Sequence, residues 1–368
     1  MKFSRRAFIS FIIGIGVAVI SAKLFMRQKF FGKLPAGERL KRIMKSSNYK
    51  GGAFQNLSFT EVTIKNASYI KMLKDFFNRP KDSEPPQVLP SVITNLKTLK
   101  ADKPTIVWFG HSSYLIKSKE ITILVDPVLS GNASPVSYFG KSFKGSEMYT
   151  VEDLPAIDML FISHDHYDHL DYKTIVKLIP KVKKFYTALG VGEHLEYWGV
   201  NPDNIVEFDW WDTHKVAKDI EVIATPARHF SGRSLTRAKS LWSSFVLNIH
   251  GYKLFLGGDS GYDTHFKLIG EKYGPFDIAM LENGQYGEEW PYIHTFPEET
   301  AVAAKDLQAK VLLPVHWSKF VLANHSWNAS IKRLLPAAEK LDLTLTTPLI
   351  GEPVIIDQSY PNKVWWDI

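Results

Sequence analysis

The chain has 368 residues, enough for one large or two modest domains, and its 45% hydrophobic and 23% charged residues are ordinary for a globular protein. It contains no cysteine, which excludes disulfides, thiolate metal ligands, iron–sulfur clusters and cysteine nucleophiles. The net charge of +7 comes from scattered Lys and Arg residues and not from a basic stripe interleaved with aromatic residues, so nucleic acid is not an expected partner. A mild affinity for anionic lipid or phosphate remains.

Residues 1–26 predict a signal peptide or a short signal anchor. Lys2, Arg5 and Arg6 precede an uncharged, mostly apolar run at 7–22, and residues 4–10 resemble a twin-arginine export signal. The sequence after this run is basic and offers a poor cleavage site. We therefore expect an anchor that places the protein on the periplasmic side of a bacterial inner membrane, with retention in the cytoplasm as the alternative.

Residues 27–100 predict a basic linker and an N-terminal extension. One helix is expected at 69–77, and a Pro-rich break follows at 79–86. The extension either packs on the main domain or forms a loop near its active site.

From residue 101 to residue 368 the pattern predicts a single α/β (α+β) domain. Short β-branched and aromatic runs predict strands at 105–109, 114–117, 122–125, 158–162, 184–187, 220–225, 244–249 and 253–256. Turn residues separate the first three, as in an antiparallel meander. Helices are expected at 173–178, 298–307 and 327–341. Strands with interleaved helices over this length indicate a layered sandwich.

The loop after the predicted strand at 158–162 is the most informative stretch. It holds His164, His166, Asp168 and His169 within six positions, an order that suits two adjacent divalent metals. Neutral imidazole and carboxylate are preferred ligands of zinc, although manganese and iron also accept them. A solvated His-rich tract is the alternative, but the fixed offsets and the flanking elements favour a metal site.

One loop cannot close two metal sites, so further ligands should follow later strands. His229 comes just after the strand at 220–225, Asp259 lies in a Gly-rich segment after the strand at 253–256, and His316 follows an apolar run at 311–315. Each of them alone would be a structural polar residue. Their shared position at the end of an apolar strand makes them candidate ligands.

In their order along the chain, these motifs resemble the metallo-β-lactamase superfamily, and within it the branch of N-acyl-phosphatidylethanolamine phospholipase D and its bacterial relatives. The resemblance covers roughly residues 45–345, and its motifs lie at 108–111, 125–127, 164–171, 226–231, 241–245, 258–262, 294–299 and 316–317. It implies an αββα sandwich with a dinuclear metal site on the shared edge of two sheets.

Carried over to this sequence, the resemblance implies two zinc ions with seven ligands. His164, His166 and His229 would bind one ion, Asp168, His169 and His316 the other, and Asp259 would bridge them. Water held between two cations ionises near neutral pH and attacks as hydroxide, which Asp168 and Asp259 would orient.

Three further residues receive supporting roles from the same resemblance. His294 would lie near the substrate phosphate as an electrophile or general acid. His111 and Asp126 would fix the tautomers of ligand histidines through hydrogen bonds, with a buried structural role as the alternative.

The expected function is therefore a zinc-dependent hydrolase of a phosphodiester, with a small-molecule or lipid substrate, a phospholipid-like one above all, and a membrane surface as partner. The segment 282–286 reads Glu-Asn-Gly-Gln-Tyr where the family carries Pro-Ile-Gly-Ala-Tyr, which leaves the substrate open. Two alternatives are a hydrolase of lactones or other cyclic esters and, from another class, a non-catalytic membrane-tethered metal-binding protein. The sequence does not indicate an oligomeric state.

Overall fold

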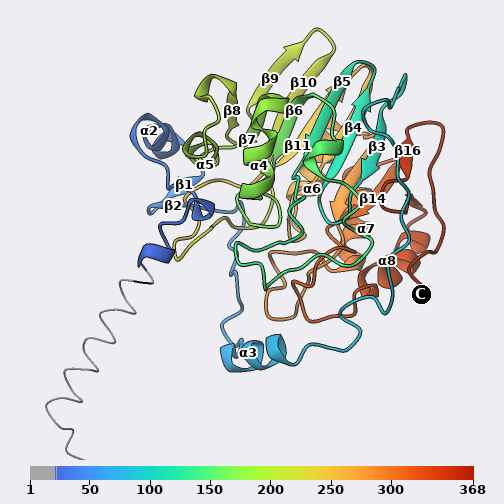
Figure 1. Cartoon of the computed structure of the whole chain (residues 1–368), viewed down its shortest axis with the longest axis horizontal. Helices are drawn as coiled ribbons and strands as arrows, with labels where there is room; N and C mark the ends of the chain where they lie inside the picture. Colours follow the sequence, from blue (N-terminus) through green and yellow to red (C-terminus); the bar gives the residue numbers. More distant parts are fainter. Residues whose placement is uncertain (1–20, 22) are drawn as a thin grey trace, which may run out of the picture.

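Two mixed β-sheets pack face to face and carry helices on their outer faces, which gives four layers in the order αββα (Figure 1). The computed structural model describes residue 21 and residues 23–368, so nearly all of the predicted signal or anchor segment lies outside the described residues. Within the described part of the chain, no helix is both long and apolar enough to cross a membrane. The layers confirm the predicted sandwich.

The first sheet has seven strands in the order β16-β3-β4-β5-β6-β7-β8. Their bounds are β3 (Thr105–Trp108), β4 (Tyr114–Ser118), β5 (Ile121–Val125), β6 (Ile157–Ile162), β7 (Val182–Ala188), β8 (Ile205–Phe208) and β16 (Pro353–Ile355). Neighbours from β16 to β5 are antiparallel, which confirms the predicted meander, and neighbours from β5 to β8 are parallel. Strands β8 and β16 were not predicted.

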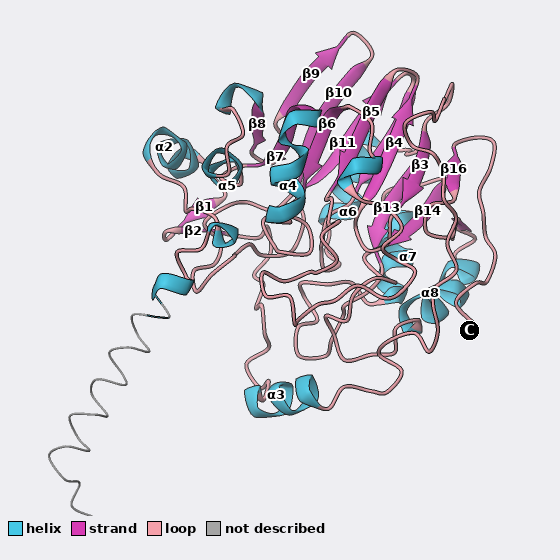
Figure 2. Cartoon of the chain, viewed as in Figure 1, coloured by secondary structure: helices cyan, strands magenta, loops and turns pink. Residues whose placement is uncertain are grey.

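The second sheet also has seven strands, in the order β15-β14-β13-β12-β11-β10-β9. Figure 2 shows the strands in magenta and the helices in cyan. Their bounds are β9 (Thr213–Ala217), β10 (Ile220–Thr225), β11 (Ser244–Ile249), β12 (Tyr252–Leu256), β13 (Ile278–Glu282), β14 (Val311–Val315) and β15 (Thr344–Leu345). Neighbours from β9 to β12 are antiparallel, and those from β12 to β15 are parallel.

The central strands are apolar on both faces because one face meets the other sheet and the other face meets helices. In β3, Ile106 and Trp108 belong to the core between the sheets, whereas Val107 belongs to the core under the helices. Successive side chains of a strand point to opposite faces, so this alternation follows directly from the strand geometry.

Five helices form the two outer layers. On the first sheet lie α4 (Tyr172–Leu178) and α5 (Gly192–Tyr197), and on the second lie α6 (His265–Tyr273), α7 (Pro297–Asp306) and α8 (Ala329–Lys340). The helices predicted at 173–178, 298–307 and 327–341 are confirmed to within two residues at each end. α5 and α6 were not predicted.

The N-terminal extension packs on the main domain, as one of the two expectations stated. It contains α2 (Gly37–Lys45), the short pair β1 (Tyr49–Lys50) and β2 (Ala53–Phe54), and α3 (Tyr69–Phe77). Ile43, Phe54 and Leu96 are buried in the core of the first sheet. α3, by contrast, stands away from the sheets at the bottom of the view in Figure 1.

Candidate metal centre

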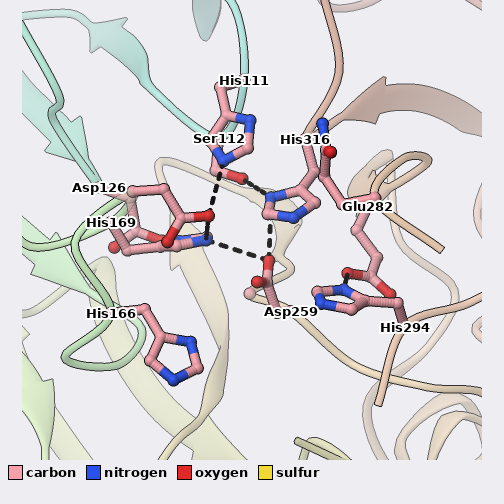
Figure 3. A network of polar contacts seen from close by, with 12 residues as sticks. His111, Ser112, Asp126, His166, His169, Asp259, Glu282, His294 and His316 are labelled. Carbon is pink, nitrogen blue, oxygen red and sulfur yellow. Dashed lines mark hydrogen bonds and ion pairs between the residues drawn. The ribbon is translucent and has the colours of Figure 1, made fainter. Parts of the chain in front are cut away.

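Every predicted site residue except His294 follows the C-terminal end of a strand along one edge of the sandwich. β3, β5 and β6 run in the same direction in the first sheet, and β10, β12 and β14 do so in the second. The segments that follow these strands carry, in that order, His111, Asp126, the loop at 164–169, His229, Asp259 and His316. Figure 3 shows His169, Asp259 and His316 turned toward one another.

Three histidines gather on one side of this centre. Nδ1 of His166 lies 2.9 Å from Nε2 of His164 and 3.1 Å from Nε2 of His229. Together with Asp259, these side chains offer four ligand atoms within 4.8 Å of one another. On the other side, a second group of the same compactness comprises His111, Asp168, His169 and His316.

Asp259 lies between the two groups and turns one oxygen to each. Its Oδ2 lies 3.8 Å from Nε2 of His164 and 3.7 Å from Nε2 of His229. Its Oδ1 lies 3.1 Å from Nε2 of His169 and 3.0 Å from Nδ1 of His316. A carboxylate that faces two ligand groups with separate oxygens has the geometry of a bridging ligand.

The residues present fit a bound cation. Nε2 of His316 is buried and makes no hydrogen bond within the described part of the chain. Nε2 of His169 and Oδ1 of Asp259 are buried 3.1 Å apart as an ion pair that lacks hydrogen-bond geometry. Each unsatisfied buried polar group costs roughly 1–3 kcal/mol, and a cation among these atoms would give them a partner. Imidazoles and carboxylates without thiolates suit zinc and also accept manganese or iron.

The charge states of most ligands also suit a metal. Burial lowers the pKa values of His164, His229 and His316 well below the usual range, which keeps these rings neutral. Burial alone would raise the pKa of Asp259, but His169 and His316 hold it well below its usual range, so the carboxyl is ionised. Neutral imidazole and ionised carboxylate are the forms that bind metals.

His169 is the exception among the ligands. Burial alone would lower its pKa, but Asp259, Asp168 and Asp126 raise the pKa well above the usual range. Three carboxylates around one ring attract positive charge, so a proton and a metal ion compete for this position.

Hydrogen bonds to the Nδ1 atoms orient the rings of two candidate ligands, His169 and His229. Oδ2 of Asp126 lies 2.8 Å from Nδ1 of His169, and Asp126 also accepts hydrogen bonds from the backbone N–H and hydroxyl of Ser163. Nδ1 of His229 donates to the carbonyl oxygen of Ile293 over 2.8 Å. Asp126 therefore lies where its predicted role requires. Nε2 of His111 lies 3.1 Å from Oδ2 of the predicted ligand Asp168. Among the described residues, His111 makes no hydrogen bond with a histidine nitrogen.

Three site residues adopt backbone conformations that favour glycine. The φ angles of Asp126, His111 and His316 are 40°, 52° and 66°. Such conformations cost about 1–3 kcal/mol each and persist only where the surrounding structure enforces them. At this edge the fold therefore maintains unfavourable backbone conformations, which orient these particular side chains.

Sequence analysis missed Glu282 as a site residue. It ends β13, its side chain is buried, and its Oε2 lies 2.8 Å from Nδ1 of His294. His294 in turn stacks on the ring of His316, with 5.4 Å between the ring centroids. The rule that found Asp259 and His316, a polar residue at the end of an apolar strand, would also have found Glu282.

Comparisons with known proteins agree with this architecture. Residues 122–317, just over half of the chain, match the family described as beta-lactamase superfamily domain. An uncharacterized protein of Mycobacterium tuberculosis is 38% identical over 328 residues, 87% of each chain. An N-acyl-phosphatidylethanolamine-hydrolyzing phospholipase D of Caenorhabditis elegans is 30% identical over 67% of this chain and 74% of its own length.

A solved structure shares the fold. A metallo hydrolase from the archaeon Ignicoccus hospitalis superposes with a TM-score of 0.54 at 20% identity, over 70% of this chain and all of its own. The matched residues 122–317 include all seven predicted ligands, although their metal binding stays a prediction. The chain belongs to the metallo-β-lactamase superfamily and is a metal-dependent hydrolase.

Proposed function

We propose that the chain is a dinuclear zinc hydrolase that cleaves a phosphodiester bond in a phospholipid-like substrate. The observation that carries the proposal is the position of Asp259, whose two oxygens face two separate ligand groups. Relatives in Caenorhabditis elegans and Saccharomyces cerevisiae are named as phospholipases D that hydrolyse N-acyl-phosphatidylethanolamine, at 30% and 34% identity. Their names support the substrate class.

In this proposal His164, His166 and His229 would hold one zinc ion, Asp168, His169 and His316 would hold the other, and Asp259 would be shared by both. Bound there, the two ions would lower the pKa of water and neutralise charge on the phosphate. Asp168 and Asp259 accept hydrogen bonds from the attacking water and orient it. His294 faces the same space and donates a hydrogen bond to a phosphate oxygen as negative charge develops on it.

A membrane surface is the proposed partner, and α3 supports it. None of its nine residues is buried, and Ile70, Leu73 and Phe77 share one face with exposed fractions of 71%, 59% and 72%. The opposite face meets the protein through Lys71, whose ammonium pairs with Glu289 at 2.6 Å.

An apolar helix face that points outward, next to basic residues, suits the boundary region of an anionic bilayer. Lys74 borders this face, and Lys81 lies just beyond the helix. The predicted anchor at 1–26, of which residues 1–20 and 22 lie outside the described residues, would add a second attachment from the periplasmic side.

The test is metal analysis joined to a substrate screen. The zinc-loaded protein should hold about two zinc ions per chain and hydrolyse bis(4-nitrophenyl) phosphate and N-acyl-phosphatidylethanolamine in vesicles. His166→Ala should lose zinc and turnover together. Turnover of a lactone without turnover of either diester would replace the phosphodiesterase proposal by the cyclic-ester alternative. Two bound zinc ions without turnover of any of these compounds would keep the metal centre and reject both substrate classes.

A further inference from the structure

Glu282 is a carboxylate beside the metal centre with no assigned task. It lies at the end of β13, pairs in register with Val315 of β14, and is therefore one residue away from the level of His316. The backbone passes so close here that a Cβ on Gly284 would lie 2.4 Å from the carbonyl oxygen of His316. Glu282 is thus fixed to the same rigid strand ends as the metal ligand.

Both oxygens of Glu282 are engaged. Oε2 accepts from Nδ1 of His294 at 2.8 Å, and Oε1 accepts from the backbone N–H of Thr295 at 2.5 Å. The side chain is only 4% exposed, so water does not replace these partners. Because both oxygens are bound, the carboxylate has one orientation. It contacts the ring of His294 and the backbone of Thr295, which follows it in the chain.

We propose that Glu282 is the positioning residue of His294, keeping the proton on Nδ1 so that Nε2 faces the reacting groups. Burial raises the pKa of Glu282 to about 7, although the charge of His294 and the backbone N–H of Thr295 favour its ionised form. The ionised carboxylate only accepts hydrogen bonds, so the proton of this contact lies on Nδ1. The ring nitrogen that Glu282 does not contact points toward Asp259 (Figure 3). The His229 and His316 rings, at 5.0 and 5.4 Å between centroids, enclose the ring from two sides.

Electrostatics agree with this geometry. Burial alone would lower the pKa of His294, but the charge and hydrogen bond of Glu282 raise it to about 9. A carboxylate that pairs with Nδ1 of an imidazole fixes the tautomer and supports positive charge on the ring. The role of His294 itself rests on the proposed phosphodiesterase function, whereas the orientation of its ring does not.

The experiment combines a double-mutant cycle with a spectroscopic measurement on the full-length protein. Glu282→Gln keeps the size of the side chain and removes its charge, so kcat on bis(4-nitrophenyl) phosphate should fall about 10- to 100-fold. KM should change less than about threefold, because binding of the ground state is untouched. In a His294→Gln background, Glu282→Gln should have no further effect.

The spectroscopic arm needs no substrate. In protein labelled with ¹⁵N-histidine, the His294 ring signals are assigned by their loss in His294→Gln. Measured at a pH above about 9, where the ring is neutral, they should report the Nδ1–H tautomer in the wild type and a shift toward the Nε2–H tautomer in Glu282→Gln. Glu299→Gln is the matched control, because Glu299 accepts from the Phe296 backbone N–H at 2.9 Å in the same region without contacting His294. It should leave both readouts unchanged.

Three results would overturn the proposal. Additive losses in the double variant would mean that Glu282 acts separately from His294. Loss of zinc from Glu282→Gln would make Glu282 a metal ligand, within the group that it forms with Asp259, His294 and His316. Unchanged His294 ring signals would show that Glu282 does not set the tautomer, and they would do so even if the protein turned over no phosphodiester at all.

Discussion

In most proteins polar side chains are exposed and apolar side chains are buried. The edge of the sandwich that carries the candidate ligands and helix α3 depart from this distribution in opposite ways. At the edge, His169, Asp259 and His316 are at most 2% exposed although they are polar. On α3, Ile70 and Phe77 are more than 70% exposed although they are apolar. Both arrangements are costly for an isolated chain, because buried polar groups need partners and exposed apolar groups order water.

The two regions differ in how their side chains are arranged in space. The buried polar atoms at the edge converge on a common centre, which is how a small cation is bound. The apolar side chains of α3 diverge over a convex helix, and an extended apolar phase can cover several of them together, as the proposed membrane contact requires. One region thus suits an ion and the other suits a surface.

The largest expected effect is at the bridging carboxylate. Asp259→Asn keeps the shape but removes the charge that both ligand groups share, so turnover should fall on the order of a thousandfold or more. Elemental analysis should find fewer than two zinc ions per chain. Full zinc content and full activity in Asp259→Asn would show that neither zinc binding nor turnover needs a carboxylate shared by the two ligand groups.

A smaller effect, on zinc affinity, is expected at Asp126, which contacts the candidate ligand His169. Asp126→Asn loses the charge that faces Nδ1 of His169 at 2.8 Å, so zinc affinity should fall about 10- to 100-fold. Titration with a competing chelator measures this directly. The same affinity as wild type would mean that backbone geometry alone orients the His169 ring.

The contrast between the regions also explains what the sequence could predict. The convergence of the candidate ligands was predictable because each follows an apolar strand, and strands reveal their ends through turn residues and hydrophobic runs. Helix α5 was not predictable from periodicity because it has six residues, four of them buried, including Glu193 and His194. Glu193 is buried through ion pairs with Lys33 and Arg39, which are about 160 positions away in the sequence. Such tertiary pairing leaves no local signal.

α3 was predicted as a helix, but its outward apolar face was not. An amphipathic pattern states that one face is apolar and does not state what covers it. The structure adds that the polar side is next to the protein, because Lys71 pairs with Glu289.

The next prediction uses the absence of cysteine from the chain. A single Leu73→Cys can carry an environment-sensitive fluorophore, whose emission should shift to the blue on vesicles with anionic lipid and be quenched by spin-labelled lipid. Leu268→Cys, on α6 and 47% exposed, is the control on another face and should respond weakly. Equal responses at both positions would remove α3 as the membrane-facing element.

The same surface should influence turnover only at a membrane. Leu73→Ser with Phe77→Ser removes apolar area worth about 1.5 kcal/mol or more per side chain, so KM for a vesicle substrate should rise at least about tenfold. Hydrolysis of soluble bis(4-nitrophenyl) phosphate and the thermal stability should stay at wild-type values. A matching loss on the soluble substrate would mean that α3 supports the fold or the active site instead.

The smallest expected effect is on the pH dependence of stability. It concerns His265, a buried histidine that is not a candidate metal ligand. His265 on α6 is 2% exposed and makes a 3.0 Å hydrogen bond with the hydroxyl of Ser260, outside both ligand groups. Burial lowers its pKa to about 3, against about 6.5 in an unfolded chain. As the pH falls below about 6.5, the unfolded chain takes up a proton that the folded chain refuses. The free energy of unfolding should therefore fall by about 1.4 kcal/mol for each pH unit between those two values because of this residue. Denaturant unfolding of the zinc-loaded protein at pH 7, 6 and 5 measures the slope, and His265→Gln should reduce it by that amount. If the slope is unchanged in this variant, His265 does not contribute to the acid sensitivity. The sensitivity would then come from the candidate metal ligands.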